Sequence, residues 1–505
     1  MSRPHFSPAA VLRFPKTLAL VAGLASATGF APLGLWPVTL LCLALVMQLV
    51  RTAPDLRAAL ARGYWFAVGH FTIGLNWIAG SFAYQDAMPA WLGWVAVVAL
   101  SFYLAVYPAL AAGLAWRHGR GHRLTFVLLF AAAWIVTEWL RATVFTGFAW
   151  NPLGVVWVGA SGVTRSIGTY GLSGLVLIGS GALWLIAQRQ RRGGGVLALF
   201  CLLALVAGLV PSATTPGPAQ RPLLRVVQPN IGQQDKHNAA FDAINFRKLE
   251  AMTGAPEGTP RLILWPEAAI PDYIQEEPWA RARLASLLGP KDALLTGGVA
   301  LEYDRAGKLV GARNSVFALL ADGRITSRYD KSHLVPYGEY LPMRPVLSAI
   351  GLSRLVPGDL DFWPGPGPRS FDVPGFGRVG FQVCYEMIFS GQVVERANRP
   401  AFIFNPSNDA WFGSWGPPQH LAQARLRAVE EGLPVVRSTP TGISAIVDAN
   451  GAIMNSVQYR KAGYIEATLP EAYQPTLFAR LGNILSLAFA LALTALAIAT
   501  RRRLR

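Results

Sequence analysis

Cysteine, histidine and acidic residues are scarce in this sequence. Its 505 residues include 3 cysteines, 7 histidines and 28 acidic residues, against 45 lysines and arginines. Cys42 and Cys201 lie inside apolar runs, where a thiol usually serves as a small hydrophobic group. Cys384, in the stretch GFQVCYEMIF, is therefore left without a disulfide partner. It is either an inert core residue or a residue kept for its reactivity.

Motifs that define other enzyme classes are missing or misplaced. No G-x-S-x-G motif is present, which argues against a serine hydrolase. The glycines of GFGRVG, 375–380, precede a strand-like run instead of leading from a strand into a helix, which disfavours a dinucleotide site. The histidines, His420 and His333 among them, form no metal-binding pattern. We expect neither a metal nor an organic cofactor.

Long apolar runs are abundant. The chain is 52% hydrophobic and 14% charged, with a mean hydropathy of +0.35, which is typical of a membrane protein. A spanning helix needs about 20 mostly apolar residues. Eight runs are candidates for such helices: 18–33, 36–50, 63–83, 90–116, 124–142, 167–187, 196–210 and 479–500.

The net charge of +17 is concentrated at alternate ends of these runs. Arginines cluster around positions 51–62, 117–123 and 189–192 and in the tail RRRLR, whereas the loops APLGL and YQDAMP have no lysine or arginine. By the positive-inside rule both termini are cytoplasmic, and the charge does not indicate nucleic-acid binding. The sequence predicts a bacterial inner-membrane protein with seven transmembrane helices in 1–211, a periplasmic domain at 212–474, and an eighth helix with a basic cytoplasmic tail at 475–505.

Polar and aromatic residues of the apolar part have two interpretations. Glu138 and Arg141, three residues apart on one helix, are expected to pair with each other, although binding of a lipid head group stays open. Five tryptophans near predicted outer helix ends suggest an interfacial belt: Trp77, Trp91, Trp94, Trp150 and Trp157. Internal repeats and paired polar residues along several runs are missing, which argues against a transporter.

After residue 222 the pattern changes to short apolar runs that alternate with amphipathic segments. Strand-like runs are 223–228, 261–265, 293–301, 314–320, 379–384, 401–405, 435–439, 443–448 and 464–469. Helix-like segments are 243–252, 279–288, 391–398 and 420–431. This alternation predicts one α/β domain with an extensive buried sheet.

Three ionisable residues stand at ends of strand-like runs. Glu267 ends RLILWPE, Lys331 follows SRYD, and Cys384 ends VGFQVC. Side chains at strand ends are held by a rigid sheet and face a cleft. A thiol is a poor nucleophile at neutral pH until a base or a cation assists it. Glu267 is a candidate base, while Lys331 and the backbone amide of Tyr385 are candidate donors to an oxyanion. The set predicts acyl transfer through a thioester.

The motifs WPEAAIP, YDKSHLVPYGEYLP, GFQVCYE and NPSNDAWFG, in this order, resemble those of the nitrilase or carbon-nitrogen hydrolase superfamily. With the apolar runs before and after them, the whole chain resembles the apolipoprotein N-acyltransferase family. The resemblance implies an αββα sandwich and a catalytic triad of Glu267, Lys331 and Cys384. It also implies that Glu339, Tyr385, Glu386 and Trp411 support the pocket or the oxyanion. His237 departs from the pattern, since many relatives have an aromatic residue there.

The resemblance also implies a reaction and its partners. An acyl chain would pass from a phospholipid, through a cysteine thioester, to the N-terminal amine of diacylglyceryl-cysteine on apolipoproteins, the last step of bacterial lipoprotein maturation. The alternative is a membrane-tethered amidase that uses the same triad and gives its thioester to water. We expect a monomer in the lipid bilayer. The apolar segment 341–371 is predicted to be either a mobile interfacial cover or a packing loop.

Overall fold

The computed structural model describes residues 14–84, 88–210, 213–214, 221–236, 238–349 and 361–502. These residues form two compact units. One is helical and contains the chain up to Asn76, Trp94–Pro211 and the C-terminal segment from Leu481. The other contains Ser212–Arg480 together with Trp77–Gly93, a short segment from the helical half of the sequence. His237 lies outside the described residues.

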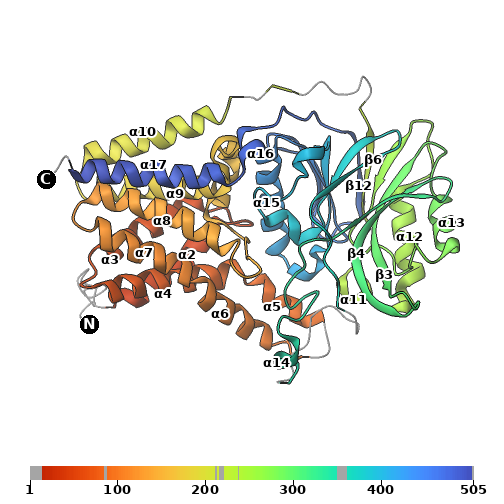
Figure 1. Cartoon of the computed structure of the whole chain (residues 1–505), viewed down its shortest axis with the longest axis horizontal. Coiled ribbons are helices and arrows are strands. Elements are labelled where there is room, and N and C mark those ends of the chain that lie inside the picture. The colour runs from red at the N-terminus through yellow and green to blue at the C-terminus, as the bar shows by residue number, and fades with distance from the viewer. Residues whose placement is uncertain are drawn as a thin grey trace, which may run out of the picture. The chain divides into compact units, whose positions relative to one another are not determined.

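The helical unit contains an apolar helix at each predicted run (Figure 1). The helices are α2 (Pro15–Ser26), α3 (Trp36–Arg51), α4 (Leu56–Gly74), α6 (Leu92–Leu104), α7 (Val106–Gly119), α8 (Arg123–Arg141), α9 (Thr164–Ala187), α10 (Arg191–Ala207) and α17 (Ile484–Arg502). A 3₁₀ segment, η3 (Leu153–Val163), leads into α9. Four continuous helical stretches in the described part of the chain have the length and hydropathy to cross a bilayer: Leu92–Gly119, Arg123–Arg141, Leu153–Ala187 and Ile484–Arg502.

Local sequence explains where these helices begin and how closely they pack. Proline occupies the first turn of α2 and α3, where its missing N–H costs no helical hydrogen bond. The Asp55 side chain caps α4 by accepting from the Ala58 amide at 2.7 Å. A Cβ on Gly23 of α2 would lie 1.9 Å from the carbonyl oxygen of Phe66 in α4. Only glycine allows this close approach of the two helices.

Two sequence interpretations are resolved inside the helical unit. Glu138 and Arg141 are buried and lie 3.9 Å apart, and both also bind the segment that follows α8. Glu138 Oε1 accepts from the Leu153 amide at 2.8 Å, and Arg141 donates to the Trp150 carbonyl at 3.0 Å. These contacts favour a structural role for the pair. Trp150 is fully buried, so its assignment to an interfacial belt is wrong.

The second unit consists of two six-stranded sheets. The first has the order β12-β1-β2-β3-β4-β5, with β1 (Leu223–Gln228), β2 (Arg261–Leu264), β3 (Ala293–Tyr303), β4 (Leu309–Leu320), β5 (Ile325–Asp330) and β12 (Gly463–Thr468). The second has the order β11-β10-β9-β8-β7-β6, with β6 (Arg369–Val373), β7 (Gly377–Phe381), β8 (Phe402–Pro406), β9 (Val435–Ser438), β10 (Ser444–Val447) and β11 (Ile453–Val457). Strands β1, β2 and β3 run parallel, as do β7, β8 and β9.

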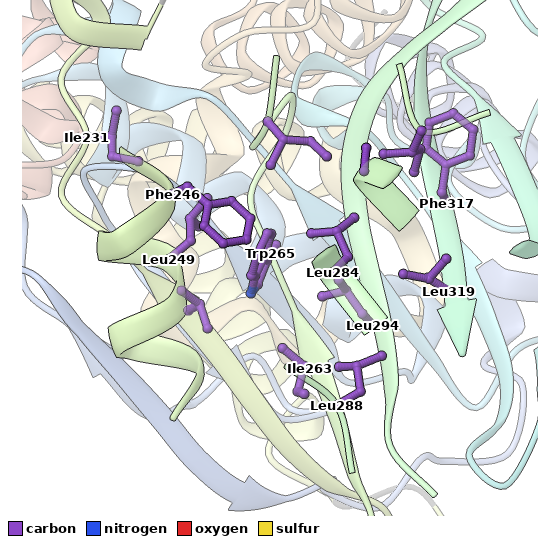
Figure 2. Packing of buried hydrophobic residues seen from close by; sticks show 14 of the residues in the cluster. Ile231, Phe246, Leu249, Ile263, Trp265, Leu284, Leu288, Leu294, Phe317 and Leu319 are labelled. Carbon is purple, nitrogen blue, oxygen red and sulfur yellow. The ribbon is translucent and has the colours of Figure 1, made fainter. Parts of the chain in front are cut away.

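Helices cover the outer face of each sheet, which gives the predicted αββα sandwich (Figure 1). On the first sheet, α12 (Asp242–Thr253) and α13 (Pro278–Ala285) contribute Phe246, Leu249 and Leu284 to a core around Trp265 (Figure 2). On the second, α15 (Gly416–Glu431) packs apolar residues on β8, β9 and β10. Burial of such side chains stabilises each layer by roughly 2 kcal/mol per residue.

Two expectations for this unit are wrong. Segment 391–398 is not an α-helix, and only Arg396–Asn398 forms a short 3₁₀ helix, η6. Gly391 has a positive φ of 76°, and Glu395 accepts from the Ser370 amide at 2.9 Å instead of lying on a helix face. Trp77 is not an exposed interfacial residue, since its ring packs 4.5 Å from that of Phe412. Strands β6 and β11 were not predicted, because neither has an uninterrupted apolar run.

Candidate active site

Glu267 lies in a turn that packs closely against the backbone of the neighbouring strand β3. The turn follows β2, and its Ala269 amide donates to the Gly297 carbonyl of β3 at 3.0 Å. A Cβ on Gly297 would lie 2.7 Å from the Cα of Glu267. Gly297 of β3 therefore allows this close backbone approach. It places the Glu267 carboxylate at the end of the parallel strands, as predicted for a strand-end residue.

Lys331 directly follows β5 and is held on both sides of its peptide unit. Its amide donates to the Asn314 carbonyl at 2.9 Å, and its carbonyl accepts from the Gly365 amide at 2.8 Å. The Gly365 contact comes from the C-terminal part of segment 341–371. Gly365 of that segment therefore contacts Lys331, α14 (Arg344–Ala349) is helical, and 350–360 lie outside the described residues.

Lys331 lies between two carboxylates. Its Nζ is 3.3 Å from Glu267 Oε1 and 2.9 Å from Glu339 Oε1, and all three side chains are buried. Burial lowers the pKa of Lys331, but the two carboxylates outweigh burial and raise it above the ordinary value. Burial raises the pKa of Glu267, but Lys331 and Lys236 outweigh burial and lower it. Both groups are therefore charged at neutral pH.

Asn314 of β4 completes this cluster and escaped the sequence analysis. Its Nδ2 donates to Glu267 Oε1 at 2.7 Å and to Glu339 Oε1 at 2.9 Å. Glu339 Oε2 accepts from the Val335 amide at 2.8 Å. The sequence signal for Asn314 is weak, because this amide stands between the polar residues Arg313 and Ser315 at the start of an apolar run.

Cys384 has a φ of 50°, which is left-handed backbone, at the start of the short helix η5 (Cys384–Ile388) after β7. A non-glycine residue in this region costs roughly 1–3 kcal/mol and persists only where its surroundings fix it. The backbone N–H of Asn408 is oriented toward the Cys384 sulfur and favours its ionised form. Burial and the charge of Glu267 raise the pKa of Cys384 well above the ordinary value, against the opposing effect of Lys331. The resting residue is thus a thiol that needs a base.

Glu386 joins the Cys384 segment to the Lys331 segment. Its Oε2 accepts from the Val383 amide at 2.7 Å, next to Cys384. Its Oε1 accepts from the Tyr329 hydroxyl at 2.8 Å and from the amide and hydroxyl of Ser332 at 2.8 and 2.6 Å. Glu386 therefore connects the segment that follows β7 in the second sheet with the end of β5 in the first sheet.

Tyr385 and Trp411 take different positions around the nucleophile. Tyr385 is buried, with its ring 5.7 Å from that of His333 and 5.2 Å from that of Phe389. Trp411 accepts at its carbonyl from Ser81 at 2.9 Å, and its ring lies 5.9 Å from that of Tyr84. The segment Trp77–Gly93 thus reaches the residues that follow Asn408.

A second buried network lies under the nucleophile and was also missed. It contains Asp409, His420 and Arg437, all with no measurable exposure. His420 Nε2 lies 3.0 Å from the carbonyl oxygen of Cys384, and Nδ1 lies 3.0 Å from Asp409 Oδ1. The Cys384, Asp409 and His420 ligand atoms lie within 4.8 Å of one another, as in a metal site. Arg437, however, binds both Asp409 and His420, so a cation already occupies this place.

The two sheets, the strand-end carboxylates and lysine, and the thiol at a left-handed turn define a class of cysteine enzymes. Residues 223–476 match the family model described as carbon-nitrogen hydrolase. The catalytic unit is therefore a carbon-nitrogen hydrolase domain with a nitrilase-like fold.

The helical half narrows the assignment. Residues 22–182 match the model described as the apolipoprotein N-acyltransferase N-terminal domain. Curated apolipoprotein N-acyltransferases are similar over nearly the full chain. The protein of Rhodopseudomonas palustris is 32% identical, over 96% of this chain and 95% of that protein. The one of Caulobacter vibrioides is 36% identical, over 94% and 92%. The chain belongs to the apolipoprotein N-acyltransferase family.

Proposed function

We propose that the chain transfers an acyl chain from a phospholipid to the N-terminal amine of diacylglyceryl-cysteine on apolipoproteins, with Cys384 as the nucleophile. The observation that carries the proposal is the buried Glu267–Lys331–Glu339 cluster in electrostatic contact with the Cys384 thiol. The names of the relatives supply the acyltransferase reaction. They favour an amine acceptor over water, and hence disfavour the amidase alternative.

In the first half-reaction Cys384 Sγ attacks the ester carbonyl of the phospholipid while Glu267 takes the thiol proton. Lys331 and the Tyr385 amide stabilise the negative charge on the carbonyl oxygen, a role in which one donor contributes about 3 kcal/mol. The C–O bond then breaks, and the lysophospholipid leaves with the proton from Glu267. A thioester remains on Cys384.

In the second half-reaction the amine of the apolipoprotein attacks the thioester carbonyl. Glu267 accepts the proton that the amine loses, the C–S bond breaks, and the thiol of Cys384 recovers a proton. The products are an amide-linked acyl chain and the free enzyme. Such a cycle is ping-pong, and it requires that water be kept from the thioester.

The proposed membrane arrangement follows from the charge pattern. We place eight helices across the inner membrane, both termini in the cytoplasm, and the catalytic unit in the periplasm, where both lipid substrates are within reach. Support comes from the apolar helices at each predicted run and from the arginines at alternate ends. The domain limits 1–211, 212–474 and 475–505, and the monomeric state, stay predictions.

The test uses phospholipid with a labelled acyl chain and the purified full chain in mixed micelles. We expect label on the protein that hydroxylamine removes, and its absence in Cys384→Ala. Addition of a diacylglyceryl lipopeptide with a free N-terminus should move the label into an amide. Release of the label as free fatty acid in the presence of the lipopeptide would instead support the amidase.

A further inference from the structure

A second lysine, Lys236, lies beside the catalytic cluster. It ends the short helix α11 (Gln233–Lys236), which follows β1. Its Nζ donates to the backbone carbonyl of Glu267 at 2.8 Å. With the Asn408 amide oriented so that its oxygen faces donors, Lys236 Nζ also lies 3.2 Å from that oxygen. The backbone N–H of Asn408 is oriented toward the Cys384 sulfur. Lys236 is therefore fixed between the segment of the base and the segment that contacts the nucleophile.

The charges around the thiol show why a second cation matters. Glu267 and Glu339 are two carboxylates that share one ammonium, that of Lys331. Asp409, which also faces Cys384, is already neutralised by Arg437. The described ion pairs of Glu267 and Glu339 thus involve a single ammonium, and a thiolate or an oxyanion would add further negative charge. Unpaired negative charge in a buried site is costly.

The hydrogen-bond donors of the Lys236 ammonium also point to a role at the sulfur. An ammonium has three N–H groups. Among the residues that the structure describes, the Glu267 carbonyl and the Asn408 side chain engage two of them. Lys236 also has an electrostatic interaction with Cys384 itself. A third N–H is thus available for the group that reacts at the sulfur.

We propose that the site uses two lysines, and that the ammonium of Lys236 stabilises the Cys384 thiolate and the negative charge that develops during attack on the acyl carbonyl. This inference deepens the proposed function and rests on it for the identity of the acyl group. Lys331 holds the carboxylates in place, while Lys236 supplies the charge that balances the site when the sulfur ionises.

The protonation of Lys236 gives the proposal a pH signature. Burial lowers the pKa of Lys236 to about 8, against the opposing effects of Glu267 and Cys384. The Lys236 ammonium is thus present below about pH 8 and is lost above it. This transition lies inside the pH range of the alkylation assay described below. An arginine at this position would stay charged throughout. The groups that face Lys236 and Cys384 are Glu267, Lys331 and Asp409.

The experiment measures the rate at which iodoacetamide alkylates Cys384 between pH 6 and 10. The full chain in detergent is used, with Cys42→Ala and Cys201→Ala so that one thiol remains. We expect Lys236→Gln, which keeps a donor for the Glu267 carbonyl but no charge, to react about tenfold more slowly at pH 7, the effect of a thiol pKa raised by about one unit. Lys236→Met should match it. Lys308→Met, at an exposed turn, is the control and should react like the parent.

Lys236→Arg provides the sharper comparison. The parent rate should stop rising above about pH 8, where Lys236 loses its proton, whereas the rate of Lys236→Arg should continue to rise. An unchanged pH profile in folded Lys236→Gln, with thermal melting like the parent, would overturn the proposal. A Lys236→Arg profile that levels off at the same pH would do so as well. Because alkylation needs no lipid, this result is independent of whether phospholipid is the acyl donor.

Discussion

At the scale of single residues, the geometry of Cys384 depends on a histidine whose tautomer is set by its neighbours. The Cys384 carbonyl is an acceptor only, so His420 Nε2 must be the donor across the 3.0 Å contact. Nδ1 lies 3.0 Å from both Asp409 Oδ1 and the Arg437 guanidinium, and burial and Arg437 lower the pKa of His420 against the opposing effect of Asp409. Arg437 also binds Asp409, which fixes the guanidinium. This network holds the left-handed turn on which the sulfur stands.

Replacement of His420 tests this role. His420→Phe keeps the ring volume but loses the bond to the Cys384 carbonyl, and misplacement of a reacting atom by about 1 Å can cost 100-fold. We expect acyl-enzyme formation to be about 100-fold slower in His420→Phe than in the parent. His420→Gln keeps an N–H donor and should react at least about tenfold faster than His420→Phe. The measurement is single-turnover labelling with acyl-labelled phospholipid. Equal rates for the two variants would show that the N–H donor to the Cys384 carbonyl does not control the position of the sulfur.

Lys331 is expected to be essential for folding as well as for catalysis. Lys331→Met removes the ammonium that contacts both Glu267 and Glu339, and the loss of one partner of a buried ion pair typically destabilises by roughly 3–5 kcal/mol. In Lys331→Met with Glu339→Gln one of these charges is gone, so part of the stability should return while activity stays absent. Thermal and denaturant unfolding of the two variants give the comparison. A double variant no more stable than Lys331→Met would contradict the ion-cluster description.

At the scale of elements, the end of α15 contains two adjacent buried glutamates in different settings. Glu430 accepts from the Ser390 hydroxyl at 2.7 Å and pairs with Arg427 at 2.8 Å. For Glu431, burial and the neighbouring Glu430 raise the pKa to about 7 from the ordinary 4.5. Negative charge at the C-terminal end of a helix is also unfavourable. At the end of α15 the charge of Glu430 is thus stabilised by Arg427 and Ser390, whereas ionisation of Glu431 is unfavourable.

This difference predicts opposite effects of two similar substitutions. Glu431 binds its proton more tightly in the folded chain, so stability is full below about pH 4.5 and decreases until about pH 7, by roughly 3 kcal/mol. Glu431→Gln should therefore raise the melting temperature at pH 8 and change it little at pH 5. Glu430→Gln should lower the melting temperature at both pH 5 and pH 8, because it removes the ion pair with Arg427. A melting temperature of Glu431→Gln that is below the parent at pH 8 would contradict the assignment.

Element prediction from sequence succeeded where one physical effect dominates. Runs such as 223–228 and 261–265 are buried on both faces in a parallel layer, so they read as unbroken apolar strands. β11 was not predicted because it lies at a sheet edge and is largely exposed, so its sequence has no alternation of apolar and polar residues. Segment 391–398 has helical spacing of apolar residues, but its Glu395 binds a distant backbone amide, a tertiary contact that no local pattern contains.

Site prediction had a similar limit. Glu267, Lys331 and Cys384 were found because each stands at the end of a strand-like run, and the structure brings Glu267 and Lys331 together beside the thiol. Their catalytic roles stay predictions. Lys236, Asn314 and His420 were missed as site residues, since each reaches the site through a contact between segments more than 30 residues apart in sequence. Pairings of this length leave no periodic signal.

At the scale of the whole molecule, the proposed topology predicts which loops solvent reaches from outside the cell. In a chain with Cys42, Cys201 and Cys384 replaced by alanine, Lys308→Cys marks the catalytic unit, and Arg120→Cys marks the loop between α7 and α8. We expect a membrane-impermeant maleimide to label Lys308→Cys in cells with a permeabilised outer membrane, and Arg120→Cys only after the inner membrane is broken. The reverse pattern would place the catalytic unit in the cytoplasm.

The pairing of β1 with β12 decides how the catalytic unit is joined to the rest of the chain. Leu223, at its start, lies opposite Thr468, near its end. The segment Trp77–Gly93 is a further part of this unit that comes from elsewhere in the sequence. Because the first and last strands of the sandwich are neighbours, the chain enters and leaves the sheets side by side, and neither connection has to traverse them. The strand order of each sheet is therefore independent of the helices that precede and follow the sandwich in the sequence.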